Sequence, residues 1–233
     1  MTQPRAVIFD LLTGLLDSWA VWDAVIPESE RHITDGTTWR KRYLELAFAC
    51  GSYKPYESLV EQGATDVGLS KAAPEALFQR YLEIEPWPEV PEVLVQLKRQ
   101  GMKLGVATNI SDELGRRVVK NTERFVREKT GSEDFAFDAV VTAEESGNYK
   151  PKPQPYRDVL EKLDLIPEQA LFLAGSPTDI QGAAGVGMRV CWNNHIGLVK
   201  KHDVEPLREG RDLREALQDF LVSSSYAAPE NQR

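Results

Sequence analysis

The sequence contains little of what several protein classes require. Only two of its 233 residues are cysteines, Cys50 and Cys191, and they lie far apart without a CxxC spacing. This pattern favours reduced packing residues over a disulfide or a metal site. The three histidines, His32, His195 and His202, also lack any ligand spacing. We therefore assign no chemistry to them.

Charge and hydropathy argue against two further classes. The longest basic run is Arg40-Lys41-Arg42 and the formal net charge is −8, whereas binding of nucleic acid needs clustered Lys and Arg that displace counterions. No apolar run approaches the ~18 residues of a membrane span. The first residues, 1–5, lead directly into an apolar strand without the apolar core of a signal peptide. We expect a cytoplasmic protein that binds neither nucleic acid nor membrane.

The apolar residues that are present form short runs typical of buried strands, with amphipathic helical patterns between them. The predicted strands cover residues 5–10, 103–108, 137–142, 171–175 and 189–192, and the predicted helices cover 91–100, 154–163, 178–186 and a closing segment, 213–222. Alternating strands and helices predict an α/β fold with a parallel sheet and helices on both of its faces.

The interval between the first two strands is too long for a single crossover. It runs from Leu15 to about Trp87, holds several helical patterns and no convincing strand, and has turn signals at both borders. We predict an inserted α-helical cap domain, residues 15–87, on a core domain of residues 1–14 and 88–233. Residues 223–233 are expected to form a loose tail.

Reactive side chains follow the ends of four predicted strands, where ligands bind in an open parallel sheet. Asp10 ends the first strand, Thr108 and Asn109 end the second, Lys150 follows the third, and the segment 175–179 follows the fourth. Each has a structural explanation when taken singly, such as a helix cap for a carboxylate or a solvated loop position for the lysine. Their joint placement at successive strand ends favours one active site.

This order of motifs resembles the haloacid dehalogenase superfamily over nearly the whole chain. The four matching segments are Ala6-Val-Ile-Phe-Asp10-Leu-Leu-Thr-Gly14, Val106-Ala-Thr108-Asn109, Lys150-Pro-Lys-Pro153 and Ala174-Gly-Ser-Pro-Thr-Asp179. The resemblance implies a Rossmann-like core and covalent catalysis through an ester of Asp10. It also implies that Lys150 holds Asp10 ionised and that Asp179 is the base for the hydrolytic water.

Two departures from the superfamily pattern argue against a phosphatase. The phosphatases place an acid two residues after the nucleophile and a Mg²⁺-binding Asp in the fourth motif, where this chain has Leu12 and Gly175. Phosphoryl transfer depends on metal neutralisation of developing charge. We therefore expect substitution at an sp³ carbon without a metal or cofactor. The leaving group must depart without an acid, as a halide or a protonated, strained ring nitrogen does.

The predicted cap offers a cation for the substrate. The segment Thr38-Trp-Arg-Lys-Arg-Tyr-Leu-Glu-Leu46 resembles the cap segment of L-2-haloacid dehalogenases, in which the Arg after Trp faces the active site, and Arg40 holds that position. A guanidinium can hold a substrate carboxylate or neutralise a departing halide. Both interpretations imply a small 2-substituted carboxylate as substrate. The alternative is that Arg40 belongs to a solvated helix face.

A longer string, Phe9-Asp-Leu-Leu-Thr-Gly-Leu-Leu-Asp-Ser-Trp19, resembles the dehalogenase-like branch that contains L-azetidine-2-carboxylate hydrolase, which opens a four-membered imino acid ring to 2-amino-4-hydroxybutyrate. This interpretation is favoured because Leu12 removes an acid that the reaction does not need and provides an apolar wall against ring methylenes. The alternatives are an L-2-haloacid dehalogenase, then a phosphatase, then an inactive binding module on the same fold.

The predicted catalytic residues are therefore Asp10, Lys150 and Asp179, and the substrate-binding candidates are Leu12, Thr13, Trp19, Arg40, Thr108, Asn109 and Ser176. Backbone amides after the nucleophile, with the polar pair of the second motif, are expected to bind the substrate carboxylate or the oxyanion of ester hydrolysis. Trp19 and Trp39 are candidates for lining the pocket, although such residues are more often core. A homodimer is left open.

Overall fold

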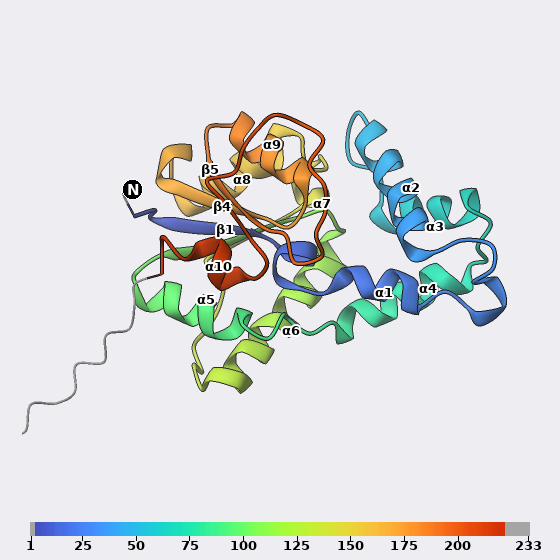
Figure 1. Cartoon of the computed structure of the whole chain (residues 1–233), viewed down its shortest axis with the longest axis horizontal. Helices are drawn as coiled ribbons and strands as arrows, with labels where there is room; N and C mark the ends of the chain where they lie inside the picture. Colours follow the sequence, from blue (N-terminus) through green and yellow to red (C-terminus); the bar gives the residue numbers. More distant parts are fainter. Residues whose placement is uncertain (1–2, 222–233) are drawn as a thin grey trace, which may run out of the picture.

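The computed structural model describes residues 3–221, which form a six-stranded sheet flanked by helices (Figure 1). All adjacent strands are parallel, in the order β3-β2-β1-β4-β5-β6. The strands are β1 (Ala6–Asp10), β2 (Lys103–Thr108), β3 (Ala139–Thr142), β4 (Ala170–Ala174), β5 (Arg189–Asn193) and β6 (Arg208–Gly210). The predicted α/β fold with a parallel sheet is confirmed.

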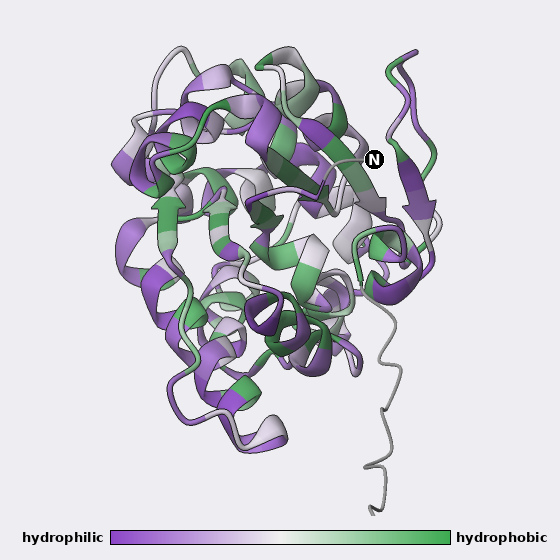
Figure 2. Cartoon of the chain, turned by 90° about the vertical axis from the view of Figure 1, so that its left-hand side faces the viewer, coloured by the Kyte–Doolittle hydropathy of each residue, from purple (hydrophilic) through white to green (hydrophobic). Residues whose placement is uncertain are grey.

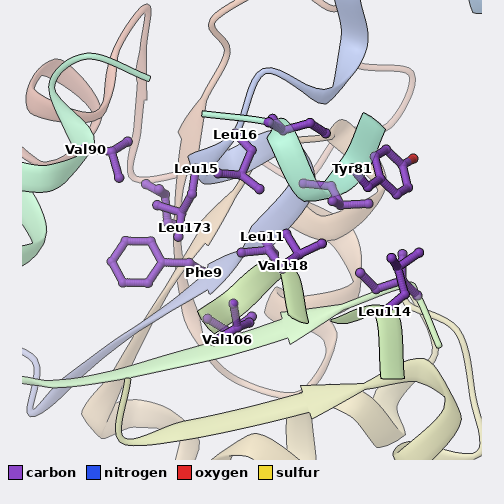
Figure 3. Packing of buried hydrophobic residues seen from close by; sticks show 14 of the residues in the cluster. Phe9, Leu11, Leu15, Leu16, Tyr81, Val90, Val106, Leu114, Val118 and Leu173 are labelled. Carbon is purple, nitrogen blue, oxygen red and sulfur yellow. The ribbon is translucent and has the colours of Figure 1, made fainter. Parts of the chain in front are cut away.

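The central strand, β1, is buried on both faces because helices cover both sides of the sheet. On one side Val7 and Phe9 pack with α5 (Val90–Arg99) and α6 (Asp112–Thr130), and α10 (Leu213–Leu217) lies on the same side. On the other side Ala6 and Ile8 pack with α8 (Pro153–Leu163) and α9 (Pro177–Gly185). In Figure 3, Phe9, Val106 and Leu173 from three neighbouring strands lie in the same cluster as Val118 of α6.

The sequence prediction lacks the strand β6, the helix α6, the short helix α7 (Ala143–Ser146) and the 3₁₀ turn at Pro167–Gln169. The edge strand β6 is only Arg-Glu-Gly, so it carries no apolar run, and Figure 2 shows it as a hydrophilic strand beside hydrophobic ones. The 19-residue helix α6 buries residues spaced by three and four positions, from Leu114 to Val126. That spacing is a clear amphipathic helical pattern, so the sequence carries the signal for this helix although the prediction omits it. Both β6 and α6 lie outside the strand ends that carry the motifs.

Residues 15–87, here called the helical insert, form a separate group of helices beside the sheet (Figure 1). They comprise α1 (Ser18–Ala24), α2 (Gly36–Ala49), α3 (Tyr56–Asp66) and α4 (Ala72–Arg80), with 3₁₀ turns at Glu28–Glu30 and Tyr81–Glu83. The two connections to the sheet pair at one antiparallel bridge between Leu16 and Pro86. The division into cap and core domains at these borders stays a proposal.

The C-terminal prediction is wrong in its length. The helix α10 ends at Leu217 rather than at Val222, and turns follow it to residue 220. Val222 and the predicted tail, 223–233, lie outside the described residues. Both cysteines are buried free thiols, as predicted for packing residues. Across residues 3–221 no helix has the length and apolar character needed to cross a membrane.

Candidate active site

The carboxylate of Asp10 caps the turn that directly follows β1. That turn is the short π-helical segment η1 (Leu11–Leu15). The Oδ2 atom of Asp10 accepts hydrogen bonds from the Thr13 amide at 2.8 Å, the Thr13 hydroxyl at 2.5 Å and the Gly14 amide at 3.1 Å. Burial raises the pKa of Asp10, but the Lys150 ammonium and the bonds from Thr13 outweigh it and hold the pKa below its ordinary value. Asp10 is therefore ionised, with one oxygen fixed by three donors.

Lys150 joins the two carboxylates of the site. Its Nζ lies 2.8 Å from Oδ1 of Asp10 and 3.0 Å from Oδ2 of Asp179, and its side chain is 2% exposed. Burial lowers the pKa of Lys150, but the two carboxylates raise it by more than burial lowers it. The net shift of this pKa is therefore upward. The ammonium is thus a permanent charge that neutralises both neighbours in part.

Asn109 holds the segment that carries Lys150. Its Nδ2 donates to the Lys150 carbonyl at 2.9 Å, and its Oδ1 accepts from the Lys150 amide at 2.7 Å. The side chain that was predicted to bind substrate is therefore engaged on both sides by backbone, which indicates a positioning role. Its neighbour Thr108 is 1% exposed, and its hydroxyl has no partner within the described structure.

Asp179 lies in the first turn of α9, on the far side of Lys150. Its Oδ1 accepts from the Tyr156 hydroxyl at 2.7 Å, and the Ser176 hydroxyl lies 3.5 Å from its Oδ2. Burial raises the pKa of Asp179, and the attraction of Lys150 only partly offsets this, so the net shift is upward. A carboxylate with a raised pKa is a stronger base than a solvated Asp, as a water-activating group requires.

The sequence analysis does not identify Tyr156 as a site residue. It lies on the buried face of α8, in the helix that follows the third motif. A Cβ atom at Gly182 of α9 would lie 2.5 Å from the Tyr156 hydroxyl oxygen, so this glycine allows the two helices to approach. The only signal in the sequence is a phenol at an otherwise apolar helix position, which is too common to single out.

Leu12 and Gly175 occupy the positions where phosphatases of the superfamily carry carboxylates. Leu12 is a buried residue of the turn after Asp10. A Cβ atom at Gly175 would lie 2.2 Å from the Thr13 carbonyl carbon and 2.3 Å from the Gly14 nitrogen. The backbone around Asp10 therefore leaves no room for a side chain at position 175.

The donor set also fits a divalent metal poorly. Within residues 3–221 no group of three or more His, Cys, Asp or Glu side chains gathers as metal ligands. The two carboxylates at the site, from Asp10 and Asp179, instead share the ammonium of Lys150.

Arg40 of α2 lies in a buried aromatic environment. Its Cζ atom is 3.7 Å from the centroid of the Trp19 ring and 5.8 Å from that of Trp22, and its Nη1 donates to the Ser18 hydroxyl at 3.3 Å. Its Nε is buried without a partner, and the residue is 7% exposed. Burial lowers the pKa of Arg40, and the nearby Tyr81 and Tyr56, followed by Asp10, offset this only in part. The alternative of a solvated helix face is wrong.

The other tryptophan considered for the pocket is a core residue. Trp39 is fully buried, and its indole donates to the Val60 carbonyl at 3.0 Å within the helical insert. Trp22 packs edge-on against it at 4.6 Å between ring centroids. One further insert residue reaches the motifs, because the Tyr43 hydroxyl donates to the Asn109 carbonyl at 3.1 Å. The helical insert is thus anchored beside the second motif.

The predicted residues therefore form two groups. Asp10, Lys150 and Asp179 contact one another directly, and Thr13, Asn109 and Ser176 contact this group. Arg40 and Trp19 contact each other in the helical insert, and the charge of Asp10 acts on the guanidinium. Gly14, Ser18 and Tyr156 join these groups without having been predicted.

Comparisons with known proteins identify the family. A family model described as haloacid dehalogenase-like hydrolase matches residues 4–187. The haloacetate dehalogenase H-2 of Moraxella sp. (strain B) is 29% identical over 209 residues, which cover 84% of this chain and 88% of that protein. The (S)-2-haloacid dehalogenase of Pseudomonas putida is 27% identical over 237 residues, which cover 96% and 99% of the two chains.

Solved structures show the same fold. The L-2-haloacid dehalogenase of Xanthobacter autotrophicus superposes with a TM-score of 0.75 at 22% identity, covering 94% of this chain and 100% of that one. The same enzyme with chloropropionic acid covalently bound superposes with a TM-score of 0.72. At this level of identity the likeness supports the arrangement of helices and strands.

Proposed function

The chain belongs to the haloacid dehalogenase-like hydrolases, and we propose that it displaces a leaving group from an sp³ carbon of a small 2-substituted carboxylate through an ester of Asp10. The family match and the dehalogenase relatives make it an enzyme of the hydrolase class. A relative of this fold has been solved with a substrate acid covalently bound. That precedent supports the covalent route.

The two oxygens of Asp10 support different roles in the proposed reaction. Oδ2 is held by three donors from Thr13 and Gly14, whereas within residues 3–221 Oδ1 accepts from the ammonium of Lys150 alone. In the first step Oδ1 attacks the substrate carbon, the new C–O bond forms, and the bond to the leaving group breaks with its electron pair. The ester that results keeps Oδ2 as its carbonyl oxygen.

The second step is hydrolysis of that ester. Asp179 takes a proton from water, and the water oxygen attacks the Cγ atom of Asp10. The negative charge then develops on Oδ2, where the Thr13 and Gly14 amides already point. Donors in place before the charge develops are the most effective way to stabilise such an oxyanion. Collapse breaks the bond between Cγ and the product oxygen, which takes the proton from Asp179 and leaves as a hydroxyl. The Asp10 carboxylic acid then loses its proton to solvent, which restores the carboxylate.

The choice of substrate rests on the pairing of the buried cations. Among residues 3–221 the buried Lys and Arg side chains are Lys150 and Arg40. Lys150 is shared by two carboxylates, whereas Arg40 forms no ion pair in that range. One unpaired cation suits one anionic group, the substrate carboxylate. This is the observation that carries the assignment.

We therefore propose ring-opening hydrolysis of L-azetidine-2-carboxylate to 2-amino-4-hydroxybutyrate. Attack of Asp10 at ring carbon C4 breaks the C4–N bond, and the protonated nitrogen leaves as a neutral amine. Such a leaving group needs neither an acid at position 12 nor a second cation, and release of ring strain drives the step. The buried Leu12 is an apolar neighbour suited to ring methylenes.

The second candidate is hydrolysis of an L-2-haloacid, and the relatives favour it. The two relatives described above are named as a haloacetate dehalogenase and an (S)-2-haloacid dehalogenase, and the match covers 88% and 99% of their lengths. In that reaction a halide leaves as an anion while the carboxylate remains, so two anionic groups need stabilisation. Arg40 would have to serve one of them, with polar groups such as the unpartnered Thr108 hydroxyl serving the other.

A substrate panel separates the two candidates. Ring opening converts a secondary amine into a primary amine, which an amine-reactive dye detects, and chloride release from (S)-2-chloropropionate reports dehalogenation. We expect ring opening of L-azetidine-2-carboxylate, none of unstrained L-proline, and none by an Asp10→Asn variant. Rapid chloride release with inert azetidine would make the dehalogenase assignment correct, and inertness toward both would contradict the proposal.

The remaining expectations from the sequence stay predictions. They are a cytoplasmic location, a small-molecule substrate as the main partner, and no association with nucleic acid or membrane. The formation of a homodimer stays open as well, and measurement of the molar mass in solution decides it.

A further inference from the structure

The guanidinium of Arg40 is held in an unusual way for a buried cation. Buried charges are normally paired with an opposite charge, because desolvation is costly. Arg40 is 7% exposed, yet no carboxylate among residues 3–221 forms an ion pair with it. The Ser18 hydroxyl accepts a hydrogen bond from it, the Trp19 ring stacks on it, and the Trp22 ring centroid lies 5.8 Å away.

Trp19 makes the closest of the two ring contacts, at 3.7 Å from the Arg40 Cζ atom to the ring centroid. Trp19 follows Ser18 in the first turn of α1. The Ser18 hydroxyl and the Trp19 ring, from consecutive residues, therefore both contact the guanidinium. Unlike Trp22, Trp19 is partly exposed and does not belong to the hydrophobic core cluster. Its indole ring therefore does little as core packing.

A contact with the face of the guanidinium leaves its donors available. The five N–H groups of an arginine lie in the guanidinium plane, whereas a stacked ring contacts the plane from above. Only Nη1 of Arg40 has a hydrogen-bond partner in the described structure, and Nε is buried without one. A carboxylate partner would instead occupy two in-plane donors and neutralise the charge.

We propose that Trp19 is a positioning residue, which stacks on Arg40 and keeps the guanidinium fixed and unpaired for the substrate carboxylate. This inference rests on the proposed function only in requiring a 2-carboxylate, which both candidate substrates carry. The Trp19 ring attracts the guanidinium through its face, so this contact can remain when a substrate carboxylate binds the N–H groups at its edge. Trp19 thereby sets affinity for the carboxylate and leaves the chemistry at Asp10 unaffected.

The test compares Trp19→Leu with Trp19→Phe, using whichever candidate substrate is turned over. Leucine keeps an apolar side chain without a ring, whereas phenylalanine keeps a smaller ring. We expect Trp19→Leu to raise KM about 10- to 30-fold with kcat nearly unchanged, and Trp19→Phe to recover most of this, as a desolvated cation–π contact predicts. An unchanged KM, or a phenylalanine variant no better than the leucine variant, would overturn the proposal.

A double-mutant cycle shows whether the effect passes through Arg40. In an Arg40→Met background we expect Trp19→Leu to change kcat/KM little, because the cation it positions is gone. An equal loss in both backgrounds would show that Trp19 acts on something else, and would overturn the proposal. The matched control is Phe125→Leu, a partly exposed ring on α6 with Lys129 at 5.2 Å, which should leave KM unchanged.

If azetidine is inert and (S)-2-chloropropionate is hydrolysed, the ring-opening assignment fails while the Trp19 test continues on the second substrate. If the substrate is opened as proposed but KM ignores Trp19, the function stands and the positioning role fails. The two failures are therefore distinguishable from the same set of variants.

Discussion

The two buried cations of this enzyme, Lys150 and Arg40, lie in contrasting surroundings. The ammonium of Lys150 contacts two carboxylates, at 2.8 and 3.0 Å, at the ends of the sheet strands. The guanidinium of Arg40 contacts a hydroxyl and aromatic rings in the helical insert. The charge on Lys150 is used within the protein, whereas the charge on Arg40 is available to a ligand.

Their pKa shifts express the same difference. Burial lowers the pKa of both groups, but Asp10 and Asp179 reverse the effect at Lys150, whose net shift is upward. At Arg40 burial prevails and the net shift is downward. A substrate carboxylate beside Arg40 would supply the partner that Lys150 already has. Under the proposed function, this contrast separates the groups assigned to the reaction from the group assigned to substrate binding.

Removing the paired cation should have the largest effect. Lys150→Met leaves two buried carboxylates without their shared partner, so we expect a loss of about 3–5 kcal/mol in the free energy of unfolding. We also expect kcat to fall at least about 100-fold, since the ammonium orients the nucleophile. Urea unfolding and steady-state kinetics measure both quantities.

The control for that variant is Lys162→Met. Lys162 is an exposed lysine of α8 that pairs with Glu145. Its removal should cost at most about 1 kcal/mol, as for other surface ion pairs. Equal losses of unfolding free energy in the two variants would show that the buried ion pairs of Lys150 stabilise the protein no more than a surface ion pair does.

Adding a third carboxylate beside Lys150 should be the next most damaging change. Gly175→Asp restores the residue type of the phosphatases, but its Cβ would lie 2.2 Å from the Thr13 carbonyl carbon. We expect a loss of about 3 kcal/mol or more in the free energy of unfolding, from overpacking against backbone and a buried charge. Gly185→Asp is the control, because nothing lies within 4 Å of a Cβ there. A stable Gly175→Asp protein with Mg²⁺-dependent activity would contradict this account.

A conservative change of the unpaired cation should have a smaller effect, confined to binding. Arg40→Lys keeps the charge but loses bidentate hydrogen bonding, so we expect KM to rise about 10- to 100-fold. The control is Arg42→Lys in the same helix, whose side chain is 39% exposed and pairs with Asp66. A change in kcat alone at Arg40 would place this cation in the chemistry rather than in substrate binding.

Removal of divalent metal should have no effect at all. The carboxylates of Asp10 and Asp179 share the ammonium of Lys150, and Gly175 stands where the phosphatases carry a Mg²⁺-binding Asp. Activity after exhaustive EDTA treatment checks this expectation. A full loss that Mg²⁺ alone restores would return the phosphatase interpretation to first place.

The sequence predicts the site around the paired cation, Lys150, well. Asp10, Lys150 and Asp179 follow strand ends in order, and parallel strands bring their carboxyl ends to one edge, so spacing along the chain translates into proximity. The strands themselves are apolar runs buried on both faces, which makes them visible. The exception is β6, because its Arg-Glu-Gly sequence carries no such signal.

The surroundings of the unpaired cation, Arg40, are harder to predict from the sequence, because they depend on how helices pack. The stacking of Trp19 on Arg40 joins α1 to α2, and no repeat in the sequence specifies which helix faces meet. Tyr156 reaches Asp179 from another helix because Gly182 leaves room for it. The sequence leaves Trp39 a candidate either for the pocket or for the core, and its indole donates to the Val60 carbonyl within the helical insert. Residue type suggests such contacts, and only packing decides them.

The covalent role of Asp10 is the central claim, and single-turnover hydrolysis in H₂¹⁸O tests it most directly. The geometry places three donors on Oδ2, ready for the oxyanion that forms when water attacks the Cγ atom. Peptide mass analysis after one turnover should therefore find ¹⁸O in the Asp10 carboxylate and unlabelled oxygen in the product hydroxyl. Label found only in the product would mean that water attacks the substrate carbon and that Asp10 is a general base.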